Sequence, residues 1–137
     1  MLRFCASLAI IAVLIVAGCR ANPIYNPSDV AFTIPTGSSK ALTLEEYKNA
    51  IIRGGSRRGW TFEEEGPGHL VGSVAVRGKH FASVDIVFDT NRYSITYKSS
   101  QNLNYNASRG EIHPNYNSWI RLLEQEIQAE IAQAKAS

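Results

Sequence analysis

Cys19 is the residue of this sequence whose chemistry is best defined by its neighbours. It closes the order Val16-Ala17-Gly18-Cys19, in which a hydrophobic residue and two small residues precede the thiol. Small side chains are needed at such a place because a peptidase pocket must admit the backbone there. We therefore expect cleavage before Cys19, which becomes the first residue of the mature chain and carries acyl chains.

The residues before Cys19 have the pattern of a bacterial lipoprotein signal. Arg3 gives a short positive start, and Ala6 to Ala17 is apolar except for Ser7. A run of about 12 apolar residues suits the centre of a signal peptide and is too short for the ~20 that span a bilayer. Residues 1–18 are thus predicted to be a cleaved signal peptide. The alternatives are an ordinary signal peptide with an incidental Cys19, or an uncleaved membrane anchor.

Acylation would hold the mature chain on a membrane of the cell envelope. One acyl chain binds a bilayer only reversibly, whereas two or more hold it stably. Arg20 follows the cysteine, where enterobacterial sorting uses Asp to retain a lipoprotein in the inner membrane. Arg20 therefore favours the outer membrane, with the domain facing the periplasm. Cys5 lies in the removed segment, so no disulfide is expected within the mature chain.

Composition bounds the remaining functions. Lys and Arg number 14 against 12 Asp and Glu, a formal net charge of +2 in 137 residues. No basic stripe indicates nucleic-acid binding, and the predicted location argues against it. The length suits one small domain.

The candidates for metal binding or catalysis are few. His69 and His80 lie seven residues apart along the predicted hairpin of strands 69–77 and 79–88. At ~3.4 Å per residue the two side chains are ~24 Å apart, which is too far to share a metal. Asp85 is central in a predicted strand, where it could be an acid or a ligand contact. The interpretation we favour is a polar residue on the solvated face, near Thr96 and Lys98. No nucleophile elbow or phosphate-binding glycine loop is found, so neither an enzyme nor a cofactor is expected.

Two segments are candidates for a partner surface. Arg57 and Arg58 could grip an anionic group with Trp60 stacking nearby, although a solvated basic turn with Trp60 in the core is favoured. The stretch Ser100 to Arg109 is rich in Asn, Ser and Tyr, and polar aromatic loops of this kind, here with Tyr105, can recognise sugars or proteins. The alternative for it is a simple connection.

The mature chain is predicted to begin with a flexible tether. Residues 19–40 hold the lipidated cysteine and three prolines, and their apolar residues have no sustained period. The twenty residues from Ala21 to Lys40 could reach ~70 Å. The segment Val30 to Ile34 could alternatively dock on the domain as an edge strand.

Two helices are predicted in residues 41–137. Thr43 and Glu46 form a capping-box pattern, and Gly54-Gly55 is expected to end the first helix. Pro114 suits the first turn of the second helix, with His113 as its N-cap or packed beside Tyr116. An apolar stripe then recurs every three or four residues: Tyr116, Ile120, Leu123, Ile127, Ile131 and Ala134.

Four strands are predicted between these helices, with short turns that make an antiparallel meander. Centring a hairpin on Gly78 pairs Gly72 with Val84, and a second turn pairs Phe88 with Tyr93. One face then collects the apolar side chains, and the other is polar. The expected fold is α+β: a four-stranded antiparallel β-meander with both helices packed on one face (α-β-β-β-β-α). The expected strands are 58–65, 69–77, 79–88 and 93–99.

These motifs in combination resemble an uncharacterised family of small proteobacterial lipoproteins. The likeness runs from the order Val16-Ala17-Gly18-Cys19 to the last helix. It is carried by Arg58-Gly59-Trp60, Pro67-Gly68, Val84-Asp85-Ile86, Tyr93-Ser94-Ile95-Thr96-Tyr97 and the segment from Ile112 to Ile120. The resemblance implies no activity or cofactor, and only Cys19 as a functional position. We expect a non-enzymatic accessory or adaptor that binds an envelope protein. The alternative is a binder of lipid, glycan or peptidoglycan.

Overall fold

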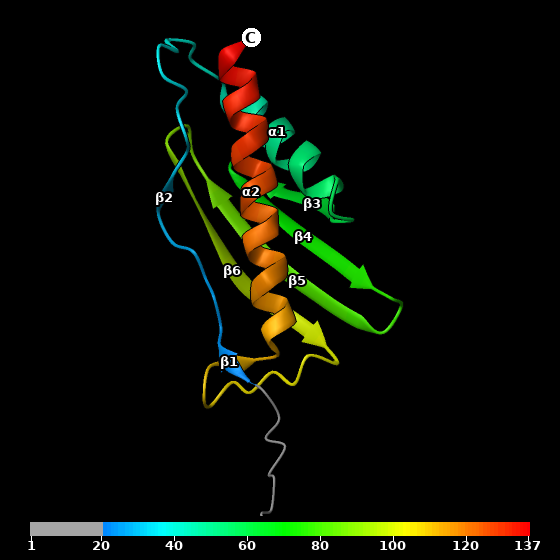
Figure 1. Cartoon of the computed structure of the whole chain (residues 1–137). Coiled ribbons are helices and arrows are strands. Elements are labelled where there is room, and N and C mark those ends of the chain that lie inside the picture. The colour runs from blue at the N-terminus through cyan, green and yellow to red at the C-terminus, as the bar shows by residue number, and fades with distance from the viewer. Residues whose placement is uncertain (1–20) are drawn as a thin grey trace, which may run out of the picture.

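The computed structural model describes residues 21–137, so the predicted signal peptide and Cys19 lie outside the described residues. The described chain is of the α+β class, as expected from the sequence. A five-stranded antiparallel sheet has the order β2-β6-β5-β4-β3, and a second sheet pairs β1 with β7. Two helices pack against each other beside the larger sheet (Figure 1).

Helix α1 (Leu44–Ser56) begins as its sequence predicts. The Thr43 hydroxyl accepts from the Glu46 backbone N–H at 3.2 Å, and the Glu46 carboxylate accepts from the Thr43 N–H at 2.7 Å. The expected stop at Gly54-Gly55 is wrong, because both glycines lie inside the helix and are buried. A Cβ on Gly54 would lie 2.8 Å from the backbone carbonyl of Glu126. These glycines therefore permit a close approach of two helices.

The predicted meander is confirmed as β3 (Thr61–Gly66), β4 (His69–Val76), β5 (His80–Phe88) and β6 (Arg92–Gln101). Gly72 pairs with Val84, and Phe88 pairs with Tyr93, which are the predicted registers. The register shifts between Ser83 and Val84, where Lys98 is the extra residue on β6 and forms a bulge. The turns and the alternation of apolar residues were sufficient to fix this part of the sheet.

The sheet has five strands, so the prediction of four is corrected. Strand β2 (Val30–Ala31) pairs with β6, which agrees with the alternative of a docked edge strand. Strand β1 (Asn22–Pro23) pairs with β7 (Glu111–Ile112) in the second sheet. Strands of two residues carry no period-2 pattern, so hydrophobic alternation cannot reveal them.

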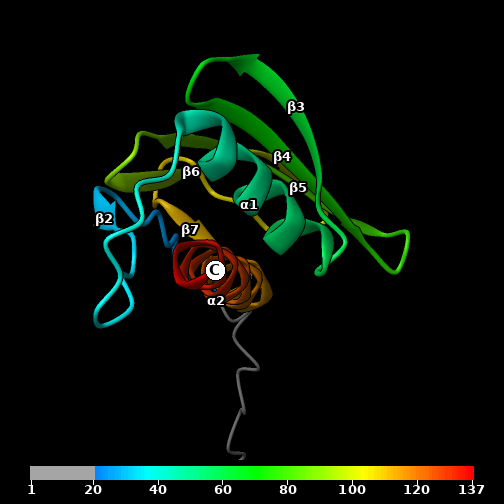
Figure 2. The same cartoon turned by 90° about the horizontal axis from the view of Figure 1, so that it is seen from above.

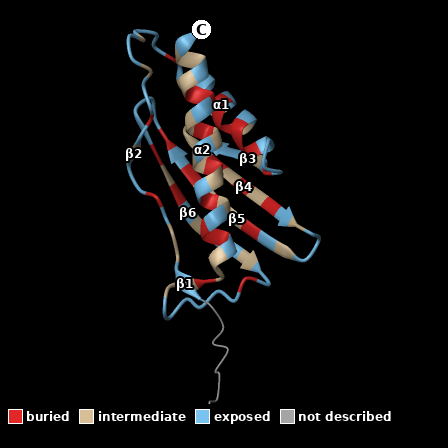
Figure 3. Ribbon diagram, in the orientation of Figure 1, coloured by how far each residue is buried: buried red, intermediate tan, exposed pale blue. Residues whose placement is uncertain are grey.

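Helix α2 (Pro114–Ala136) has Pro114 in its first turn, and His113 is its N-cap. Both helices lie on one side of the larger sheet, and no element of residues 21–137 covers the other side (Figure 2). The core lies between the helices and the sheet, where burial alternates along the strands (Figure 3). Side chains with 0% exposure include Ile51, Val84, Ile86, Ile95, Ile120, Leu123, Ile127 and Ile131. Each contributes about 1.5–3 kcal/mol by leaving water.

Candidate functional site

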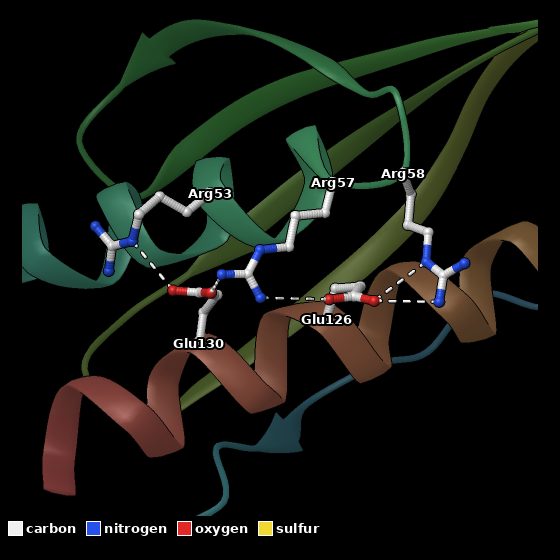
Figure 4. Close-up of polar contacts among 5 residues, drawn as sticks. All are labelled: Arg53, Arg57, Arg58, Glu126 and Glu130. Carbon is white, nitrogen blue, oxygen red and sulfur yellow. Dashed lines mark hydrogen bonds and ion pairs between the residues drawn. The ribbon is translucent and has the colours of Figure 1, made fainter.

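Arg57 and Arg58 belong to an ion-pair cluster between the two helices (Figure 4). Arg57 Nη2 lies 2.5 Å from Glu130 Oε1, and Arg58 Nη2 lies 3.1 Å from Glu126 Oε1. Arg53 Nε donates to Glu130 Oε2 at 3.1 Å. We call these five residues the interhelical cluster. Its arginines come from α1 and the turn after it, and both glutamates come from α2.

The interhelical cluster surrounds a buried carboxylate. The Glu130 side chain is 5% exposed, whereas Arg57 is 57% exposed. Arg53 pairs with Glu130 Oε2 and Arg57 with Glu130 Oε1, so both oxygens of the buried carboxylate face a guanidinium group. Trp60 does not stack on the arginines. It is buried in the core, which is the position that the favoured interpretation gave it. The arginines therefore serve first to neutralise Glu130 and Glu126.

Asp85 lies on the side of the sheet that the helices leave open. Its Oδ1 lies 2.7 Å from His69 Nε2 and 3.7 Å from Lys98 Nζ. Thr96 is its partner on β6, so the predicted neighbours of Asp85 are confirmed, and His69 joins them from β4. The carboxylate is 27% exposed. This arrangement gives a partly exposed ionic group on a sheet surface.

Tyr105 lies in the loop between β6 and β7, away from both other places. Its ring stacks on Tyr97 with centroids 4.1 Å apart, and Tyr97 meets Tyr116 edge to face at 5.8 Å. Burial raises the pKa of Tyr116, whose hydroxyl is enclosed without a hydrogen-bond partner. Tyr105 is 42% exposed and forms the outer ring of this stack. The predicted partner residues therefore occupy three separate parts of the molecule.

Helix α2 carries a row of polar side chains that binds the chain's own N-terminal residues, which the sequence analysis did not predict. Residues 21–40, predicted as a flexible tether, run along this helix in the structure, and we call them the N-terminal strap. Four polar side chains of α2 contact the strap at spacings of four, three and four residues: Asn117, Arg121, Glu124 and Gln128. Such spacing forms one stripe on a helix.

Glu124 joins three elements at the centre of this stripe. One oxygen accepts from the Tyr25 hydroxyl at 2.7 Å, and the other accepts from the Tyr93 hydroxyl at 2.6 Å. Hydrogen bonding to Glu124 raises the pKa of Tyr25, while burial and then this hydrogen bond raise the pKa of Tyr93. The neutral hydroxyls are therefore favoured as donors to the carboxylate.

Gln128 continues the attachment of the strap. Its Nε2 donates to the carbonyl of Ala31 at 3.0 Å, and its Oε1 accepts from the Thr33 N–H at 2.7 Å. Between these bonds Phe32 enters the core, with its ring 4.7 Å from Tyr47 and 5.3 Å from Tyr93. The strap is thus held by side-chain hydrogen bonds and by an apolar anchor.

Among residues 21–137, no three His, Cys, Asp or Glu side chains are grouped to hold a metal. No helix in the same range is long and apolar enough to span a bilayer. A shallow hollow of about 300 Å³ lies beside Leu44, Lys48 and Phe88, and it touches none of the predicted site residues.

Comparison with known proteins gives no relative from which a function could be carried over. No protein-family model matches the chain. No curated protein and no solved structure matches it either. The resemblance to small proteobacterial lipoproteins therefore stays a prediction.

Proposed function

We propose that this chain is a lipid-anchored lipoprotein of the bacterial cell envelope, facing the periplasm from the outer membrane. The single observation that carries this proposal is the order Val16-Ala17-Gly18-Cys19 after an apolar run led by Arg3. Acyl chains on Cys19 would supply the membrane attachment.

Palmitate labelling in cells tests the anchor, and the chain offers a matched control. Cys19→Ser should abolish incorporation of labelled palmitate and leave the precursor unprocessed. Cys5→Ser changes a cysteine of the same segment and should leave labelling and processing unchanged. Labelling that survives Cys19→Ser would overturn the proposed anchor.

We further propose that the folded domain is a non-enzymatic accessory protein that binds an envelope protein on the open side of its sheet. Four large hydrophobic side chains are exposed among residues 21–137, and two of them, Phe81 and Val87, lie on the open side of central strand β5. Asp85 lies between them with His69 and Lys98. Exposed apolar groups beside ionic groups are typical of protein interfaces.

A photo-crosslinking amino acid at position 87 tests this second part in cells. We expect it to give one defined protein adduct. The same amino acid at Gln125, an exposed position on α2, is the control and should give no such adduct. Recovery of peptidoglycan or glycan fragments from position 87 would support the alternative binder, and equal products at both positions would contradict a docking surface.

A further inference from the structure

The start of the N-terminal strap is fixed to one end of the domain. The Ile24 N–H donates to the Gly110 carbonyl at 2.9 Å, and the Tyr25 N–H donates to Asn117 Oδ1 at 2.9 Å. Asn117 Nδ2 returns a hydrogen bond to the Pro23 carbonyl at 2.9 Å, and Asn117 is buried. These bonds join the strap to the loop before β7 and to the beginning of α2.

This attachment shortens the link between Cys19 and the fold. Asn22 is already paired with Ile112, and it follows Cys19 by three residues. At no more than ~3.6 Å per residue, the lipid attachment point lies within about 11 Å of strand β1. A free tether from Ala21 to Lys40 would have allowed ~70 Å. An anchor on Cys19 therefore holds this end of the domain close to the bilayer.

The other end of the domain points away from that anchor. Helix α2 starts beside β1 and carries the C-terminus to the opposite end of the molecule (Figure 1). Its 23 residues span about 35 Å at ~1.5 Å per residue. The β5–β6 turn also lies at this distant end.

The end near β1 carries a surplus of positive charge. Loop 102–110 contains Arg109, and the adjacent β4–β5 turn contains Arg77 and Lys79, all exposed. His80 Nδ1 lies 2.9 Å from the Asn102 carbonyl, so the loop and the turn form one continuous surface. Glu111 is the acidic residue of this part of the chain. Basic side chains near a membrane are attracted to anionic phospholipids over about one Debye length.

From this arrangement we propose that loop 102–110 and the β4–β5 turn dock on the phosphates of anionic phospholipids when Cys19 is acylated. The inference rests on the proposed lipid anchor. Docking would hold α2 pointing away from the bilayer and would leave the open side of the sheet accessible from the periplasm. Each basic side chain at the surface should favour the docked orientation about fivefold.

Reconstitution of the mature acylated full-length protein tests this orientation. The vesicles contain phosphatidylethanolamine and phosphatidylglycerol, with a headgroup-linked quencher of a fluorescent label. Labels are placed on Ala107→Cys in the loop and on Ala136→Cys near the C-terminus, both exposed alanines. We expect quenching at position 107 to exceed quenching at position 136 severalfold.

Charge reversal provides the second arm. Lys79→Glu with Arg109→Glu should lower quenching at position 107 at least fivefold, whereas Arg92→Glu at the distant turn should not change it. Equal quenching at positions 107 and 136 would overturn the orientation. Strong quenching at position 107 that ignores the reversals would overturn docking on anionic headgroups. Either of these two results counts against the orientation or the docking only if the protein pellets with the vesicles and has the acylated mass. Protein lacking that mass would overturn the anchor and this inference together.

Discussion

The hydroxyl of Tyr25 donates a 2.7 Å hydrogen bond to Glu124, a residue 99 positions later in the chain. The second Glu124 oxygen accepts from Tyr93, so a single carboxylate joins the strap, α2 and β6. Strap residues without helical or strand periodicity thereby become part of the folded unit.

Removal of the Glu124 carboxylate should loosen the strap. Glu124→Ala leaves two hydroxyls without their acceptor, and Tyr93 is buried, so the free energy of unfolding should fall by about 2–3 kcal/mol. Amide hydrogen exchange should quicken at Ile24 to Phe32 more than in β5. Gln125→Ala, at the neighbouring exposed position, is the control and should change stability by less than about 0.5 kcal/mol. An unchanged exchange rate in the strap would contradict the role given to Glu124.

Stability should fall at alkaline pH. The pKa values of Tyr25 and Tyr93 are raised in the folded state above the ordinary value of 10.0. Above that value the unfolded chain binds fewer protons than the folded chain, so unfolding becomes easier as the pH rises, while the contribution is fully present below it. Denaturant midpoints at about pH 9 and about pH 11 check this, since the second should be lower. Tyr93→Phe should reduce the difference, and equal midpoints in the unsubstituted protein would contradict the assignment.

A methyl group on Gly54 should be costly despite its position in a helix. Gly→Ala usually stabilises an exposed helix by about 0.4–1 kcal/mol. At Gly54 the new Cβ would meet the backbone of Glu126 at 2.8 Å, so α1 and α2 must move apart. We expect Gly54→Ala to destabilise the fold by about 1–3 kcal/mol in denaturant unfolding. Ser56→Ala, at the exposed end of the same helix, is the control and should be near neutral. A stabilised Gly54→Ala protein would refute the close helix contact.

Removing the arginines of the interhelical cluster should lower the free energy of unfolding more than neutralising Glu130. Arg53→Ala with Arg57→Ala leaves the buried Glu130 carboxylate uncompensated and should cost about 3–5 kcal/mol. Glu130→Gln leaves arginines that are more than half exposed and can be hydrated, so it should cost clearly less. Equal losses for these variants in unfolding experiments would show that Glu130 is not the buried partner of the cluster.

The meander could be predicted because its information is local. Alternating residues and the turn at Gly78 fix which residues face each other, and the observed pairing of Gly72 with Val84 follows from them. The capping box of Thr43 and Glu46 is equally local. Elements that depend on such short-range patterns can be read from one sequence.

The strap and the second sheet could not be predicted from periodicity. Their stability depends on contacts between residues far apart in sequence, such as Asn117 with Pro23 and Tyr25. Gly54 was misinterpreted for a related reason, since a glycine inside a helix and a glycine that stops one look alike until the partner helix is known. Likewise, Arg57 resembled an unpaired cation because its partner Glu130 lies on the other helix.

Strand β3 forms one outer edge of the larger sheet, and its free backbone groups could template the addition of another strand. Three successive glutamates occupy that edge, Glu63 to Glu65, and all are exposed. Two copies approaching edge to edge would bring like charges together. Molecules at high local density would thereby resist polymerising into a continuous ribbon, and each domain would stay separate.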